Sequence, residues 1–117
     1  MADKKGFASL ENGKISYNLN IVKGIVQLAI SNVNGIAYTL NKRGEKVYAQ
    51  SLKLKEEADG IRAEVEIIVN FGYDITDVAY NVQQSIIHNV EAMSNYKITK
   101  VDVHIVNVEF PDSVDED

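Results

Sequence analysis

The sequence has no cysteine, no tryptophan and only one proline in 117 residues. Without cysteine, disulfide bonds, thiol catalysis and every cysteine-ligated zinc or iron–sulfur site are excluded. A chain of this length buries roughly two thirds of its unfolded surface, so it can form a core without such cross-links. Its 45% hydrophobic and 25% charged residues indicate one ordinary globular domain.

Basic residues are not in excess. Lys and Arg number 12 against 17 Asp and Glu, which gives a net charge of −5 at pH 7. Residues 1–108 are balanced, because the excess acids all lie at the C-terminal end: Glu109, Asp112, Asp115, Glu116 and Asp117. Nucleic acid binding relies on clustered Lys and Arg, so we expect no nucleic acid partner.

Residues 42–55 are a local exception, with a charge of about +4 from Lys42, Arg43, Lys46, Lys53 and Lys55 against Glu45. Such an excess suits contact with an anionic partner or lipid surface. A solvated loop and hairpin face explains the same residues.

Long apolar runs are also missing. A membrane-spanning helix needs about 18 or more consecutive apolar residues, and the longest candidate run is interrupted by Lys23, Gly24 and Gln27. The segment Met1–Gly6 has no apolar signal core. We therefore expect a cytoplasmic location and no direct membrane insertion.

Two segments have the spacing of amphipathic helices. In residues 19–33 the apolar stripe is Ile21, Ile25, Leu28/Ala29 and Val33, after a capping Asn18 and before Asn34-Gly35. In residues 75–94 the stripe is Val78, Val82, Ile86, Val90 and Met93, after a capping Asp74.

Strands are expected at 13–17, 36–40, 46–56, 61–71 and 98–110. Residues 61–71 alternate, with Ile61 to Phe71 apolar on odd positions and Arg62, Glu64 and Glu66 on the other face. In residues 98–110 the alternation changes parity, which predicts a bulge near 105–107. The fold class is therefore α+β, a two-layer sandwich of order β-α-β-β-β-α-β, with two helices on one face of a mainly antiparallel or mixed sheet.

Residues with catalytic chemistry are sparse. The two histidines are His88, which we interpret as a helix surface residue, and His104, which shares a strand face with Asp102. Asp102 and His104 could act as an oriented base in a hydrolase, or bind a metal if Glu64 or Glu66 joined them. An exposed polar sheet face explains all four residues, so we expect no catalytic residue, no metal site and no cofactor.

Three blocks resemble a known family. They are GKISYNLNIVKGIVQLAISNVNGIAYTL, VEIIVNFGYDITDVAYNVQQSIIHNVEAM and ITKVDVHIVNVEF, which together span residues 13–110. In this order they are similar to the opening, central helix and closing strand of the alkaline shock protein family, the envelope stress response proteins of Gram-positive-type bacteria. The short segment 41–50 resembles the small, housekeeping type of member.

This resemblance implies a non-catalytic scaffold or interaction protein that supports cell-envelope homeostasis and stress response. It would self-associate as a homo-oligomer and lie at the inner face of the membrane through a membrane-anchored partner. An alternative role is an accessory protein to a fatty-acid or dihydroxyacetone kinase-like enzyme. We expect a flexible N-terminus at 1–12, one alkaline-shock-protein-like domain at 13–111 and an acidic flexible tail at 112–117.

Self-association is expected at strand edges, because unpaired amides and carbonyls invite another strand. The candidate edges are 36–40, favoured, and 46–56. The candidate interaction surface combines these edges with the basic segment: Ile36, Tyr38, Leu40, Lys42, Arg43, Lys53 and Lys55.

Overall fold

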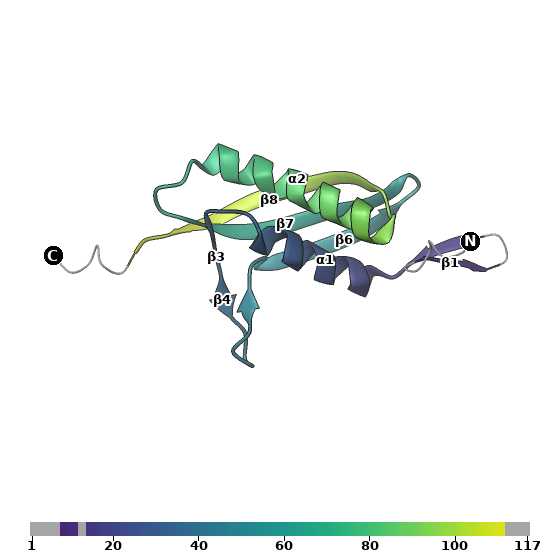
Figure 1. Cartoon of the computed structure of the whole chain (residues 1–117), viewed down its shortest axis with the longest axis horizontal. Coiled ribbons are helices and arrows are strands. Elements are labelled where there is room, and N and C mark those ends of the chain that lie inside the picture. Colours follow the sequence, from purple (N-terminus) through teal and green to yellow (C-terminus); the bar gives the residue numbers. More distant parts are fainter. Residues whose placement is uncertain (1–7, 12–13, 112–117) are drawn as a thin grey trace.

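The computed structural model describes residues 8–11 and 14–111 (Figure 1). Two helices and a mixed sheet form its body, which confirms the predicted α+β class. The strands are β1 (Ala8–Glu11), β2 (Lys14–Tyr17), β3 (Ile36–Ala37), β4 (Thr39–Leu40), β5 (Lys46–Val47), β6 (Ser51–Glu57), β7 (Gly60–Asn70) and β8 (Ile98–Glu109). The helices are α1 (Leu19–Ser31) and α2 (Ile75–Ser94).

Strand β7 is the centre of the main sheet. Strand β8 runs parallel to it along nearly its whole length. On its other edge, β6 pairs antiparallel with residues 60–66 and β3 pairs antiparallel with residues 68–69. The chain thus joins β7 to its parallel neighbour through α2, which is the βαβ connection that parallel strands require.

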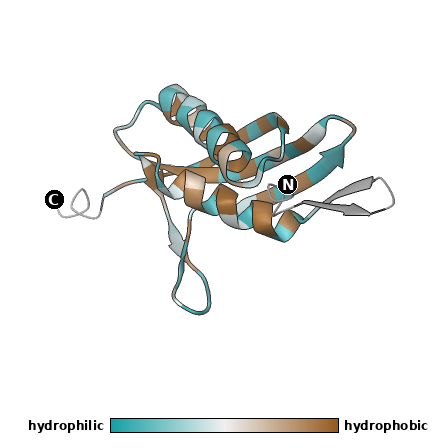
Figure 2. Cartoon of the chain, turned by 45° about the vertical axis from the view of Figure 1, so that its right-hand side comes forward, coloured by the Kyte–Doolittle hydropathy of each residue, from teal (hydrophilic) through white to brown (hydrophobic). Residues whose placement is uncertain are grey.

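Both helices cover one face of this sheet (Figures 1 and 2). The odd-numbered side chains of β7 from Ile61 to Val69 are buried, as their alternation predicts. Against them pack the α2 stripe and the inner side of α1, and Tyr96 closes one end of the core. The buried helix residues are Val22, Ile25, Val26, Ala29, Ile30, Val78, Val82, Ile86 and Val90. Figure 2 shows α1 mostly brown and α2 banded, so α1 is the more apolar helix.

The predicted helix caps are present. Asn18 Oδ1 accepts hydrogen bonds from the amides of Asn20 and Ile21, and Asp74 Oδ1 accepts one from Asp77. Helix α2 has the predicted bounds. Helix α1 ends earlier than predicted, at Ser31, and Gly35 (φ 95°) lies beyond it in a conformation that favours glycine.

The predicted strand 36–40 is wrong as one element, since it divides at Tyr38. Ile36–Ala37 pairs with β7, whereas Thr39–Leu40 turns away and pairs with β5. Likewise, 46–56 divides into β5 and β6. The division follows from competition for one edge of β7, because β6 occupies that edge beside residues 60–66 and leaves β3 only its far end.

At the N-terminal end, β2 was predicted to belong to the main sheet, and this is wrong. It pairs instead with β1 in a separate hairpin. Ala8–Glu11 was expected within a flexible segment and is a strand, while the rest of 1–12 and the tail 112–117 lie outside the described residues. Three side chains assigned to apolar faces are exposed: Phe71 stacks on Phe110, Met93 lies in the last turn of α2, and Leu28 of α1 points outward beside the buried Ala29. The bulge is confirmed, since Ile105 pairs with Ile67 and Asn107 with Ile68, which skips Val106.

Candidate interaction surface

The sheet face opposite the helices is polar. Its first row runs across three strands, since Lys55 of β6 lies opposite Arg62 of β7, which in turn lies opposite Lys100 of β8. Like charges directly opposite each other disfavour strand pairing. Three adjacent cations therefore form a row that the fold itself does not favour, here called the cation row.

One carboxylate partly compensates this row. Asp102 Oδ2 accepts hydrogen bonds from Arg62 Nε at 3.3 Å and Nη2 at 3.0 Å, and Asp102 Oδ1 lies 3.8 Å from Lys100 Nζ. The hydrogen bonds from Arg62 hold the pKa of Asp102 below its usual value, while Asp102 raises the pKa of Arg62. Lys55 forms no ion pair with any described residue.

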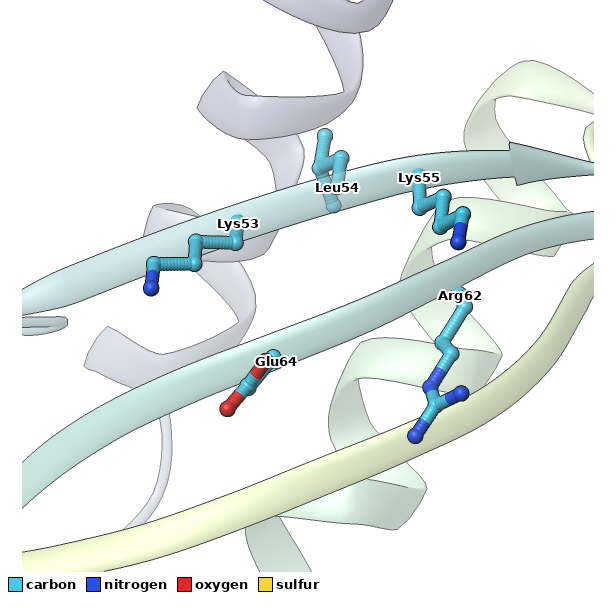
Figure 3. A pocket seen from close by; sticks show the side chains of 5 residues that line it. All are labelled: Lys53, Leu54, Lys55, Arg62 and Glu64. Carbon is cyan, nitrogen blue, oxygen red and sulfur yellow. The ribbon is translucent and has the colours of Figure 1, made fainter.

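A cavity of about 350 Å³ opens on this face, lined by Lys53, Leu54, Lys55, Arg62 and Glu64. Figure 3 shows the two lysines on β6 beside Arg62 and Glu64 on β7. Lys53 lies opposite Glu64 in the strand register, but the carboxylate of Glu64 lies 3.1 Å from His104 Nε2 instead. The lining thus holds three cations and one carboxylate that already has a neighbour.

These contacts test the hypothesis that Asp102 and His104 act together as an oriented base or as metal ligands. Both side chains lie on the outer face, as predicted, but each is bonded across to β7: Asp102 to Arg62 and His104 to Glu64. Asp102 therefore does not orient the imidazole. Among residues 8–11 and 14–111, no group of three His, Asp or Glu side chains is placed to hold a metal ion, so Glu64, Glu66 and His104 do not converge as ligands.

A hairpin formed by β4, β5 and their turn projects from the body; residues 38–48 are here called the arm (Figure 1). Tyr38 and Leu40 are exposed on it, with Lys46 Nζ lying 4.6 Å from the centre of the Tyr38 ring. At its tip, Arg43 Nη2 lies 3.3 Å from Glu45 Oε1.

The base of the arm is held by one helix side chain. Gln27 Oε1 accepts hydrogen bonds from the amides of Tyr48 and Ala49, both at 3.1 Å, and Gln27 Nε2 donates to the Ala49 carbonyl at 3.3 Å. Gln27 thus supplies the hydrogen bonds of a neighbouring strand to Tyr48 and Ala49, which pair with none of the described strands. The sequence shows only a polar residue on a helix, so no pattern revealed this role.

The seven predicted interface residues do not form one surface. Ile36 is buried in β3. Tyr38, Leu40, Lys42 and Arg43 lie on the arm, whereas Lys53 and Lys55 line the cavity on the outer sheet face. The basic residues of segment 42–55 therefore lie in two places. Lys42, Arg43 and Lys46 are on the arm, whereas Lys53 and Lys55 are on the outer sheet face.

The free edge of β8 went unrecognised in the sequence. This strand has 12 residues, and its only neighbour among the described strands is β7. Partly buried Val103 and Ile105 face the helix side, while Asp102 and His104 lie on the outer face. The strand alternation predicted its two faces, but alternation carries no information about which edge lacks a neighbour.

These features define a small α+β domain with an open strand edge, a projecting arm and a charged outer face. The profile of the alkaline shock protein 23 family, described as having a cell envelope-related function, matches residues 8–110. The chain belongs to this family, which confirms the resemblance found in the sequence.

Two relatives come from Bacillus subtilis (strain 168). The uncharacterized protein YqhY is 27% identical over 112 residues, covering 89% of this chain and 83% of that protein. The uncharacterized protein YloU is 26% identical over 87 residues, covering 73% of this chain and 70% of that protein.

Among solved structures, a variant of the MamM CTD matches with a TM-score of 0.51 and 17% identity, covering 77% of this chain and 98% of that chain. At this identity the likeness shows the fold alone. In the described part of the chain, neither helix is long and apolar enough to cross a bilayer.

Proposed function

We propose that this chain is a non-catalytic scaffold protein that supports cell-envelope homeostasis by self-association near the inner face of the membrane, where a membrane-anchored protein holds it. Membership of a family with a cell envelope-related function supports the envelope role. The single observation that carries the scaffold role is the free edge of β8, since such an edge presents a row of backbone groups to another strand.

An antiparallel pair of β8 strands centred on Val103 places apolar side chains opposite apolar ones and polar side chains opposite polar ones. In that register Val101 lies opposite Ile105 of the second copy, and both belong to the apolar helix side of the strand. Asp102 lies opposite His104 of the second copy on the outer face. Apolar pairs across strands are favourable, and this register places no like charges opposite each other.

The edge at 36–40 offers less free backbone for pairing with a second copy. Ile36–Ala37 already pairs with β7, and Thr39–Leu40 already pairs with β5, so only short stretches of backbone remain there. The outer edge of β6 carries Lys53 and Lys55, and lysines on an edge strand discourage pairing.

Proline at Val106 tests the β8 edge. Val106 is the bulged residue that β7 skips, so Val106→Pro should block the outer edge while sparing the β7–β8 ladder. Sedimentation velocity should show wild-type oligomers that shift toward monomer in Val106→Pro. Thr39→Pro, the same substitution at the competing edge, is the matched control and should sediment as wild type.

Circular dichroism of both variants checks that they fold. If Thr39→Pro dissociates the oligomer and Val106→Pro does not, association uses the 36–40 edge. If wild type dissolves into monomer in about 0.5 M salt, where charge interactions are screened, association depends on charge and edge pairing is refuted.

Affinity capture of the tagged chain from cells tests the membrane-anchored partner. Recovery of an integral membrane protein with the chain from a lysate that contains membranes, but not from a lysate cleared of membranes, supports the envelope scaffold. Recovery of a kinase-like enzyme in its place would refute that partner and support the accessory role.

A further inference from the structure

We propose that the cavity on the outer sheet face binds a phosphate monoester, with Lys53, Lys55 and Arg62 as its ligands. The site is distinct from the β8 edge, so the inference does not rest on the scaffold function. Three observations carry it: the cation row, the excess of cations in the cavity and the donors left without an acceptor.

The charge balance of the cavity favours an anion. Its lining has three cations against Glu64, whose carboxylate lies 3.1 Å from His104 Nε2. In the described part of the chain, Asp102 is the carboxylate within ion-pair distance of the cation row, at Arg62 and Lys100, and no ion pair reaches Lys55. A doubly charged anion beside Lys55 would relieve the repulsion between Lys55 and Arg62, which lie directly opposite each other.

The donors suit phosphate in their chemistry as well as in their charge. Asp102 takes Nε and one terminal nitrogen of Arg62, which leaves the second terminal nitrogen for a ligand. Lys53 and Lys55 are two residues apart on β6, so both side chains leave the same face of the strand, with Lys53 extending away from Lys55 (Figure 3). Arg and Lys together are typical of phosphate recognition. A cavity of about 350 Å³ holds a phosphate with part of the alcohol that carries it.

Two sources supply this chemistry: a soluble phosphate ester and the headgroup of a phospholipid. The first arm of the test titrates glycerol 3-phosphate into the ¹⁵N-labelled full chain at constant ionic strength. We expect saturable amide shifts at Lys53, Lys55 and Arg62. In the second arm, the chain is sedimented with vesicles of phosphatidylcholine with or without phosphatidic acid.

Three charge variants identify the site. Lys55→Gln should weaken binding by up to about fivefold, the upper end of the range that an exposed charge pair gives. Glu64→Gln should strengthen binding, since it removes the only carboxylate of the lining. Lys42→Gln, on the arm, removes the same charge outside the cavity and should leave the affinity unchanged.

Stability gives a second readout that general charge attraction would not produce. Without ligand, Lys55→Gln should raise the thermal midpoint, because it removes a like-charge contact from the cation row. With glycerol 3-phosphate, the wild-type midpoint should rise more than that of the variant, since only bound ligand stabilises the fold.

Vesicle binding that requires phosphatidic acid and follows the same order of variants, without binding of the soluble ester, assigns the phosphate to a lipid headgroup. The proposal is overturned if neither arm shows saturable binding, or if Lys42→Gln weakens binding as much as Lys55→Gln does.

Discussion

Gln27 provides a sharp test of how the arm is attached to the body. Its side chain makes three hydrogen bonds, to the amides of Tyr48 and Ala49 and to the Ala49 carbonyl. Ala49 itself is 3% exposed, so water cannot fully replace these bonds. At about 1 kcal/mol for each net hydrogen bond, and less for the partly exposed Tyr48 amide, Gln27→Ala should cost about 2 kcal/mol.

Thermal unfolding measures this cost, and about 2 kcal/mol corresponds to a fall in midpoint of roughly 8–12 °C for a domain of this size. Lys23→Ala is the matched control, because Lys23 is exposed one turn earlier on α1 and its replacement brings a similar gain in helix propensity. Hydrogen exchange adds local detail, since the amides of Tyr48 and Ala49 should lose protection while those of β7 keep it. Equal midpoints for the two variants, with unchanged protection at Ala49, would refute the anchoring role of Gln27.

The core and the outer face give two further predictions. Ile86 is fully buried in α2, so Ile86→Ala should cost about 2–5 kcal/mol, whereas Met93→Ala, at a 46% exposed position, should cost under about 1 kcal/mol in denaturant unfolding; similar costs would contradict the assigned helix face. Arg62 holds the pKa of Asp102 below its usual value, so Asp102 stabilises the fold above the pKa that it has in the unfolded chain, and this stability is lost as pH falls through its folded pKa. Thermal midpoints should therefore fall more steeply from about pH 5 to 2.5 in wild type than in Asp102→Asn, and parallel curves would show that the Arg62 contact has no role in the pH dependence.

Periodicity in the sequence predicted which side chains are buried. The alternation in β7 and the stripe in α2 each identify a buried face, because burial acts on every second residue of a strand and on every third or fourth of a helix. Capping by Asn18 and Asp74 was equally predictable, since it depends only on residues within one turn. These local rules determine the two-layer arrangement.

The pairing of strands across the sheet was harder to predict from the sequence, because it depends on how strands compete for a neighbour. The break at Tyr38 arises where β6 and β3 share one edge of β7. The same limit applies to the outer face: Asp102 and His104 are neighbours on β8, yet their bonds to Arg62 and Glu64 follow from the β7–β8 register, which is shifted by irregularities. No spacing rule within one strand contains that information.

The difference between the two sheet edges also bears on the size of an assembly. A pair of β8 strands related by a two-fold axis uses the same edge on both copies, so the interface closes on itself and leaves no β8 edge for a third copy. The opposite edge of β7 is occupied by β3 and β6, and β6 carries Lys53 and Lys55. We therefore expect association to stop at the dimer. Light scattering should give twice the 13.0 kDa chain mass, constant as concentration rises. A mass that keeps growing with concentration would require a second, unlike interface, and the arm would then be the first element to delete.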